Sequence, residues 1–126
     1  MKIQGQAALV TGGGSGLGEA TARELARLGA RVAVLEVNMD NAKRVAAEIG
    51  GIGLQADVTS GESMQAAIDT AAEAHGPARI LMQIAGIGTA KRVIGKDGNA
   101  APLDDFAKVI NVNLIGTYNA ARLFAA

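Results

Sequence analysis

Five glycines lie close together in the stretch LVTGGGSGLGEATA, which runs from Leu9 to Ala22. They are Gly12, Gly13, Gly14, Gly16 and Gly18, and they separate an apolar run from a helix-like run. Glycine loses more backbone freedom on folding than any other residue, so a cluster of glycines inside regular structure is costly. The cluster therefore either forms a turn or lets another group approach the backbone closely.

Short apolar runs alternate with longer helical patterns along the whole chain. We expect strands at Ala7–Val10, Arg31–Glu36, Ile52–Asp57 and Arg79–Ala85. We expect helices at Gly16–Leu28 and Asp40–Ile49. A third helix should begin at the capping box Thr59–Glu62 and end at His75. The segment Gly86–Pro102 has no clear pattern, and a last helix should run from Leu103 toward the C-terminus. The near-continuous Val, Ile, Leu and Ala of the strands is typical of a parallel sheet buried on both faces.

This order of elements predicts an α/β fold over one domain, residues 1–126. The expected architecture is a Rossmann-like, doubly wound parallel sheet of four strands in the order 3-2-1-4, with helices on both faces. In this arrangement the switch point lies between the first and fourth strands, and the glycine cluster follows the first strand.

Composition excludes several classes of function. Twelve basic and twelve acidic residues leave no net charge to attract nucleic acid, and only three aromatic residues are present to stack on bases. There is no cysteine for a disulfide or a cysteine-based metal site. Neither a signal-peptide pattern nor an apolar run near the ~18 residues of a membrane span occurs, so we expect a soluble, cytoplasmic protein.

A strand, a glycine turn and a helix in succession indicate a phosphate site. The N–H groups of the helix N-terminus and the helix dipole favour an anion there. Gly12 would permit the tight turn, Gly16 would let a pyrophosphate approach, and Gly18 would let the helix pack on the strand. The pattern G-x-x-x-G-x-G is one residue longer than the G-x-G-x-x-G fingerprint. The alternative is a turn that only connects strand to helix.

Glu36 ends the second strand, twenty residues beyond Gly16. A carboxylate at this distance can accept hydrogen bonds from the adenosine ribose hydroxyls, and it repels a 2′-phosphate. No Arg or Lys lies at residues 13–15 or 37–39 to attract such a phosphate. The sequence therefore favours NAD(H) over NADP(H), and the alternative is a plain surface acid at a strand end.

These residues together resemble the short-chain dehydrogenase/reductase family. The resemblance rests on Thr11-Gly12 with Gly16 and Gly18, on Asp57-Val58 after the third strand, and on Asn113 in VNLIG. Within the family the stretches HGPARIL, AKRVIGKDG and VNLIGTYN are similar to the type 2 3-hydroxyacyl-CoA dehydrogenase branch. The resemblance implies a structural and catalytic role for Asn113, and cofactor contacts from Gly12, Ser15, Gly16, Leu17, Gly18, Glu36, Asp57, Val58, Ala85 and Gly86.

The chain also departs from the family pattern. Gln83-Ile84-Ala85-Gly86 stands where the family has Asn-Asn-Ala-Gly, and only the last two residues match. The family's catalytic serine and Tyr-x-x-x-Lys region are absent, so we expect the N-terminal half of such an enzyme, an NAD(H)-binding half-domain that is inactive alone. The alternatives are a working oxidoreductase completed by another chain, and a self-associating fragment with a vestigial nucleotide site.

Other polar residues favour structural roles. Tyr118 and Arg122 form the pattern Tyr-x-x-x-Arg, which differs from Tyr-x-x-x-Lys in its last residue. We interpret Tyr118 as a partly buried helix residue. His75 suits a helix C-terminus, and Asp104-Asp105 a helix start, so no metal site is expected. The basic residues of the long loop are expected to form a solvated surface, with phosphate contact as the alternative: Lys91, Arg92 and Lys96.

An open edge on the fourth strand and an uncovered last helix predict self-association. We expect that helix to expose Leu114, Leu123 and Phe124, and the chain to form an isologous homodimer through it, through the strand edge, or through both. The lack of cysteine, Gln83 in place of Asn, and the stop after a helix suggest an engineered or excised fragment, with natural truncation as the alternative.

Overall fold

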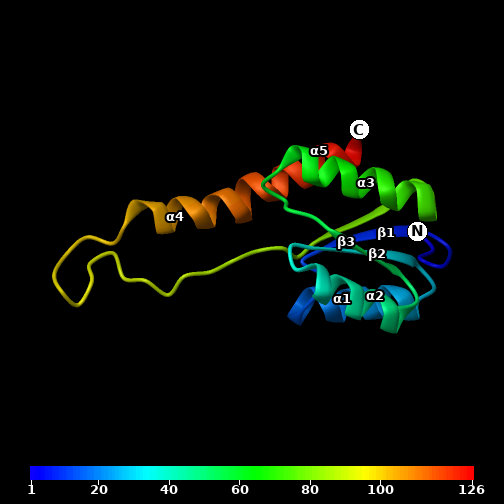
Figure 1. Cartoon of the computed structure of the whole chain (residues 1–126), viewed down its shortest axis with the longest axis horizontal. Helices are drawn as coiled ribbons and strands as arrows, with labels where there is room; N and C mark the ends of the chain where they lie inside the picture. The colour runs from blue at the N-terminus through cyan, green and yellow to red at the C-terminus, as the bar shows by residue number, and fades with distance from the viewer.

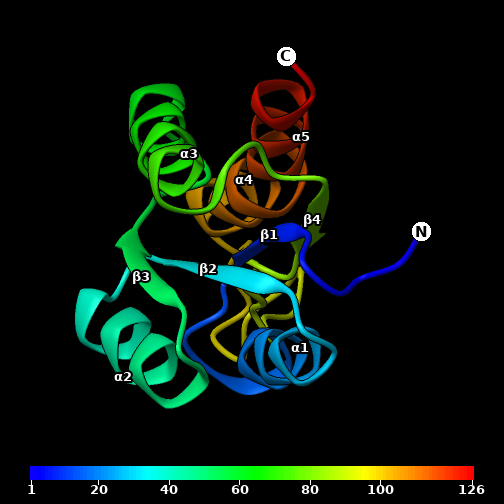
Figure 2. The ribbon, with the colours of Figure 1, turned by 90° about the vertical axis from the view of Figure 1, so that its right-hand side faces the viewer.

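Four parallel strands form the centre of the structure: β1 (Ala7–Thr11), β2 (Arg31–Glu36), β3 (Ile52–Gln55) and β4 (Ile80–Gln83). The computed structural model describes residues 1–126 and orders the strands β3-β2-β1-β4 (Figure 2). All three pairs are parallel, with β1 paired to both β2 and β4. The predicted Rossmann-like α/β fold and its strand order are therefore confirmed.

Alternate residues of β1 and β2 point to opposite faces of the sheet, as the period of a strand requires. On one face Ala8, Val10, Val32 and Val34 pack under α1 (Gly16–Arg27) and α2 (Met39–Ile49). On the other face Leu9, Ala33 and Leu35 pack under α3 (Gly61–His75) and α5 (Thr117–Ala125). These seven strand residues are almost fully buried, so the sheet has helices on both faces (Figure 1).

The start of α1 depends on a close backbone contact. A Cβ added at Gly18 would lie 1.9 Å from the carbonyl oxygen of Gly12. No side chain fits in that space, so the first turn of the helix lies directly on the glycine-rich loop. The expectation that Gly18 allows close packing holds, but the group it meets is the loop rather than the body of β1.

Several ends of elements differ from the sequence-based expectation; the fourth strand, for example, spans Ile80–Gln83 rather than Arg79–Ala85. The capping box at Thr59 is wrong, because Ser60 is the N-cap of α3 and its side chain accepts the N–H of Ser63 at 3.1 Å. Thr59 instead donates to the carboxylate of Asp57. The third strand is also shorter than expected and ends at Gln55, because the chain turns toward α3 through Ala56 and Asp57.

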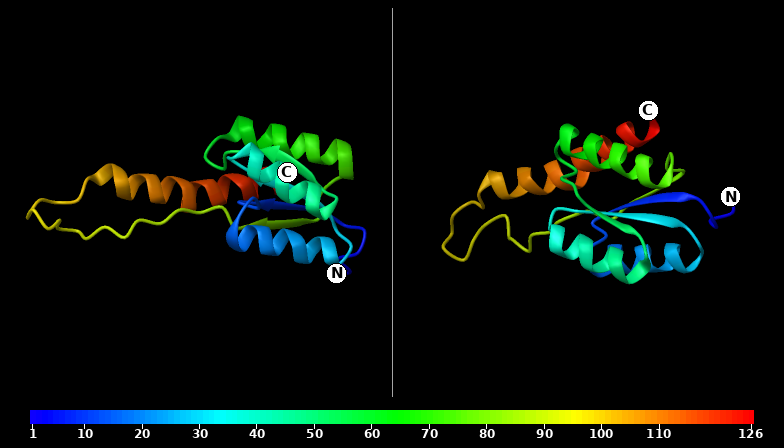
Figure 3. Two further views of the ribbon diagram at one scale, coloured as in Figure 1. Left: turned by 60° about the horizontal axis from the view of Figure 1, so that its bottom comes forward. Right: turned by 45° about the vertical axis from the view of Figure 1, so that its right-hand side comes forward.

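The last helix is not one regular helix. It comprises α4 (Leu103–Ile110), a π-helical segment η1 (Asn111–Gly116) and α5. The segment before α4, together with α4 itself, extends away from the sheet and its covering helices (Figures 1 and 3). The helix meets the core at η1 and α5, where a Cβ on Gly116 would lie 2.6 Å from Cγ2 of Val58 and Asn119 donates to the Val58 carbonyl at 2.9 Å.

Exposure along α5 and η1 corrects two expectations. Leu123 and Phe124 are partly buried and pack against the core under α3, whereas we expected them to be exposed. Tyr118 is 69% exposed, whereas we expected a partly buried tyrosine. Leu114 is 63% exposed, as expected. The differences arise because one face of α5 lies against α3, which the helical pattern alone could not identify.

None of the helices combines the length and apolarity that crossing a membrane requires.

Ion pairs connect the outer surfaces of α1 and α2. Glu19 accepts hydrogen bonds from Arg23 at 2.7 Å and from Arg44 at 2.8 Å, and Arg23 also contacts Glu48. The hydrogen bonds from Arg44 and then Arg23 lower the pKa of Glu19 from 4.5 to about 2. The carboxylate of Glu19 is therefore more strongly favoured in the folded chain than in the unfolded one.

We expect Gly18→Ala to destabilise the fold by about 1–3 kcal/mol, because the added methyl would overlap the Gly12 carbonyl. Urea unfolding followed by circular dichroism measures this loss. Gly88→Ala is the matched control, since a Cβ at Gly88 meets no atom within 4 Å. Equal unfolding midpoints for the two variants would contradict the proposed contact.

We expect the stabilising effect of Glu19 to depend on pH. Its folded-state pKa is lowered to about 2, so its contribution is present above pH 4.5 and is lost as pH falls toward 2. Glu19→Gln should lower the melting temperature at pH 7, and the difference from wild type should shrink below pH 4.5. Glu73→Gln, an exposed acid of α3 without an ion pair, is the control. A difference that does not change with pH would rule out the ion pairs as its source.

Candidate functional site

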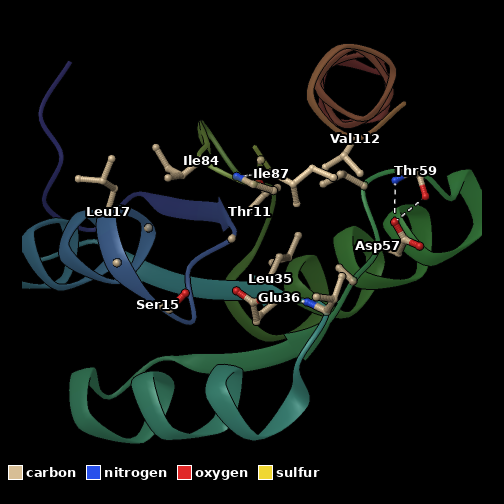
Figure 4. A pocket seen from close by; sticks show the side chains of 18 of the residues that line it. Thr11, Ser15, Leu17, Leu35, Glu36, Asp57, Thr59, Ile84, Ile87 and Val112 are labelled. Atoms are coloured by element: carbon tan, nitrogen blue, oxygen red, sulfur yellow. Dashed lines mark hydrogen bonds between the residues drawn. The ribbon is translucent and has the colours of Figure 1, made fainter. Parts of the chain in front are cut away.

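A cavity of about 680 Å³ lies at the carboxyl ends of the strands (Figure 4). This volume is in the range of small-molecule and cofactor sites. The glycine-rich loop, the end of β2, the segments after β3 and β4, and the helix of α4 and η1 all contribute to its wall. All ten residues for which the sequence predicted cofactor contacts line it: Gly12, Ser15, Gly16, Leu17, Gly18, Glu36, Asp57, Val58, Ala85 and Gly86.

Two glycines of the loop have left-handed backbone conformations. Gly12 has φ +67°, and a Cβ there would lie 2.8 Å from the backbone of Ala85. The loop therefore packs tightly on the segment after β4. Gly16 has φ +52°, and a Cβ there would meet no atom within 4 Å. The loop is thus closed toward the sheet at Gly12 and open at Gly16, where a ligand can approach the backbone.

The N-terminus of α1 has free donors on the cavity side. Ser15 is the N-cap residue, but its side chain makes no capping hydrogen bond. The N–H groups of Gly16, Leu17 and Gly18 belong to the first turn and have no carbonyl four residues back inside the helix. These donors, together with the positive end of the helix dipole, suit a phosphate group.

Glu36 extends from the end of β2 toward the glycine-rich loop (Figure 4). Its Oε2 accepts the N–H of Gly14 and its Oε1 accepts the N–H of Val37, each at 3.1 Å. These two bonds fix the carboxylate beside the loop. Each carboxylate oxygen has a second lone pair, so Glu36 can still accept hydrogen bonds from ligand hydroxyl groups.

Asp57 and Val58 form the next part of the wall. The Oδ1 atom of Asp57 accepts from the N–H of Thr59 at 2.9 Å and from its hydroxyl at 2.7 Å. The Asp57 N–H donates to Oγ of Ser63 at 3.0 Å. Oδ2 accepts no hydrogen bond from the protein, so one oxygen orders the turn into α3 and the other is available.

The end of β4 is tied to Thr11 despite its unusual sequence. Ile84 donates its N–H to the Thr11 carbonyl at 3.2 Å, and Ala85 donates to the Thr11 hydroxyl at 3.3 Å. Gln83 pairs in register with Thr11, and its Oε1 is buried without a hydrogen-bond partner. The sheet therefore continues to Gln83, but glutamine at this position leaves a buried amide oxygen without a hydrogen-bond partner.

Asn113 does not line the cavity. Its Nδ2 donates to the carbonyl of Ile87, and its Oδ1 accepts the Ile87 N–H, both at 2.8 Å. The amide therefore fastens η1 to the segment after β4, which does line the cavity. This contact fits a structural role for Asn113, while its catalytic role remains a prediction.

Sequence reasoning missed the contribution of α4 and η1 to the wall. Lys108, Asn111 and Val112 line the cavity beside Ile87. Lys108 and Asn111 are three residues apart, a spacing that places two side chains on one helix face. The spacing of Lys108 and Asn111, just before Asn113, is the sequence signal that this helix face contributes to the site.

Several other candidates lie outside the cavity. Tyr118 is on the exposed side of α5, and His75 is in the last turn of α3, where burial lowers its pKa. Asp105 is in the first turn of α4 and pairs with Lys91. Arg92 and Lys96 line a separate hollow of about 350 Å³ in the loop before α4. No cluster of His, Cys, Asp or Glu side chains suited to a metal ion is present.

A solved structure with a similar fold is a ribose-5-phosphate isomerase from Brucella melitensis 16M. It superposes with a TM-score of 0.85 at 35% identity, covering 97% of this chain and 46% of that chain. Because its name is that of an isomerase, this likeness supports the fold and not a particular reaction.

Several curated relatives are dehydrogenases by name. The 3-hydroxyacyl-CoA dehydrogenase type-2 of Drosophila melanogaster is 40% identical, over 98% of this chain and 49% of its own length, and that of Bos taurus is 41% identical, over 98% and 48%. The mitochondrial borneol dehydrogenase of Lavandula x intermedia is 33% identical, over 93% and 44%. The chain thus spans about half the length of these relatives. The family model for short chain dehydrogenases matches residues 6–126, and the chain belongs to that family.

Proposed function

We propose that this chain is the NAD(H)-binding half of an oxidoreductase that acts on a CH–OH group. Membership of the short chain dehydrogenase family and the names of its relatives support a nicotinamide cofactor. The observation that carries the proposal is that the uncapped first turn of α1 and the carboxylate of Glu36 line the same cavity. One group suits a pyrophosphate and the other suits ribose hydroxyls.

The residues of the cavity fit a dinucleotide along its length. The N–H groups of Gly16, Leu17 and Gly18 would hold the pyrophosphate, and Glu36 would accept from the adenosine ribose. Asp57 and Val58 would contact the adenine, and Ala85 and Gly86 would face the nicotinamide half. When bound, the nicotinamide would supply the hydride acceptor or donor, while these residues bind and orient it.

The same carboxylate supports a preference for NAD(H) over NADP(H). Glu36 is held beside the loop by the N–H groups of Gly14 and Val37, so it cannot swing away without losing both bonds. A 2′-phosphate would bring a second negative charge close to this fixed carboxylate, and like charges at short range repel.

We propose that the chain does not catalyse hydride transfer alone. The titratable side chains of the cavity wall are Glu36, Asp57 and Lys108, and the single tyrosine, Tyr118, lies outside it. The wall therefore offers no tyrosine to exchange a proton with a CH–OH oxygen, and Lys108 on α4 is its only ammonium group. The alternative is a working oxidoreductase completed by another chain, and growth of NADH absorbance with NAD and a 3-hydroxyacyl-CoA would favour it.

We expect calorimetric titration of the folded chain to detect NAD and to give a weaker signal for NADP. Gly16→Ala should weaken NAD binding about tenfold or more, because the methyl group would enter the open side of the loop where the phosphate is expected. Gly50→Ala is the control. Gly50 also has a positive φ, +67°, with no atom within 4 Å of an added Cβ, so both variants carry similar backbone strain.

Two results would contradict the nucleotide proposal. One is the absence of binding heat with either dinucleotide at millimolar concentration, from a chain that circular dichroism shows to be folded. The other is equal loss of NAD affinity in Gly16→Ala and Gly50→Ala, which would trace the effect to strain rather than to the site.

We also propose that the chain forms a homodimer. β4 is an edge strand, and apolar side chains gather on the exposed side of the last helix: Leu103, Phe106, Leu114, Ile115 and Tyr118. Such a strand edge and such an apolar surface favour association.

Light scattering should therefore give twice the chain mass of 12.7 kDa. Leu114→Asp should shift the mass toward the monomer, because it places a charge in the apolar surface, whereas Val93→Asp in the exposed loop should not. A monomer mass that does not change with concentration would refute the proposed dimer.

A further inference from the structure

Arg44 lies beside the glycine-rich loop although it is far from the loop in sequence. It belongs to α2, and its Nη2 donates to the carbonyl of Gly14 at 3.0 Å. Nη1 and Nη2 also donate to the carboxylate of Glu19, at 3.2 and 2.8 Å. The side chain of Arg44 is 46% exposed, so solvent and ligands can reach the guanidinium.

Gly14 lies between Arg44 and Glu36. Its carbonyl accepts from Arg44, and its N–H donates to Oε2 of Glu36. A Cβ at Gly14 would lie 2.7 Å from Cγ of Glu36, so the loop and the acidic side chain are in direct contact. A cation and an anion are therefore held on the two polar groups of Gly14, and of these two side chains Glu36 lines the cavity while Arg44 lies behind it.

We propose that Arg44 is a latent binding group for the 2′-phosphate of NADP, masked by the carboxylate of Glu36. This inference rests on the proposed function, because it takes the adenosine ribose to bind at Glu36. A phosphate on the 2′-hydroxyl would lie next to Glu36 and Gly14, within reach of the guanidinium. Arginine binds phosphate through two parallel N–H donors, and it is always charged.

The repulsion from Glu36 acts directly on the phosphate, whereas the attraction from Arg44 is reduced by its pairing with Glu19. The carboxylate therefore sets the preference, and the arginine adds to NADP affinity only when that negative charge is removed. Specificity built in this way depends on a repulsive element as well as on an attractive one.

A purely structural role for Arg44 leads to a different expectation. If the guanidinium only fixed the shape of the glycine-rich loop through the Gly14 carbonyl, its loss would weaken NAD and NADP binding by the same factor. The ratio of the two affinities separates the two roles, because a structural effect cancels in that ratio.

The experiment is a calorimetric titration of four proteins with NAD and with NADP: wild type, Glu36→Gln, Arg44→Met and the double variant. Glu36→Gln removes the charge and keeps an oxygen that can accept the Gly14 N–H. We expect it to raise NADP affinity about tenfold, and Arg44→Met in that background to remove most of the gain. NAD affinity should differ by less than roughly threefold between Glu36→Gln and the double variant.

A second readout is the salt dependence of binding. NADP affinity of Glu36→Gln should fall more steeply with salt than that of the double variant, because the arginine–phosphate contact is ionic and exposed. Arg27→Met is the control, since Arg27 pairs with Glu24 on α1 and makes no hydrogen bond to the glycine-rich loop. In the Glu36→Gln background it should leave both affinities and the salt slope unchanged.

The outcomes separate the inference from the proposed function. If wild type binds NAD, and NADP affinity in Glu36→Gln is the same with and without Arg44, the inference is overturned and the proposed function stands. Equal losses for NAD and NADP on removing Arg44 would also overturn it in favour of a structural role. If no variant binds either dinucleotide, the proposed function fails and the inference fails with it.

Discussion

The contact between Gly18 and the carbonyl of Gly12 is the constraint on which the site depends. It brings the first turn of α1 onto the glycine-rich loop at a distance that no side chain allows. Gly12 in turn lies against the backbone of Ala85, so the loop connects the start of α1 to the segment after β4. Three parts of the cavity wall are thus held by contacts between backbone atoms, and glycine is the residue that permits them.

The parts of the fold that were predicted correctly are those encoded by local patterns. β2 has the expected bounds, Arg31–Glu36, because a run of β-branched and apolar residues lies between two turn signals. The strand order follows from alternating strands and helices with right-handed crossovers. Gly12 forms the predicted tight turn, with φ +67°, because a short strand-to-helix connection leaves few alternatives, whereas Gly18 allows close approach to the loop rather than to the strand.

The parts that could not be predicted depend on contacts between distant residues. The π-helical turn of η1 lies where the helix reaches Val58, and nothing in NVNLIG alone signals it. The partial burial of Leu123 and Phe124 depends on how α5 lies against α3. The contact between Arg44 and the glycine-rich loop could not be predicted from residues near the glycine cluster or Glu36, because it follows from the packing of α2 beside α1.

The helix α4 has no buried residue, yet Lys108 on that helix forms part of the cavity wall. Segments with little buried apolar surface open locally at a lower free energy than the core of the same protein. The glycine-rich side of the cavity, which rests on the fully buried β1, and the α4 side therefore differ in their resistance to local unfolding. The α4 wall therefore opens at a lower free energy than the glycine-rich wall, and a ligand that bridges the two uses part of its binding free energy to hold α4 closed.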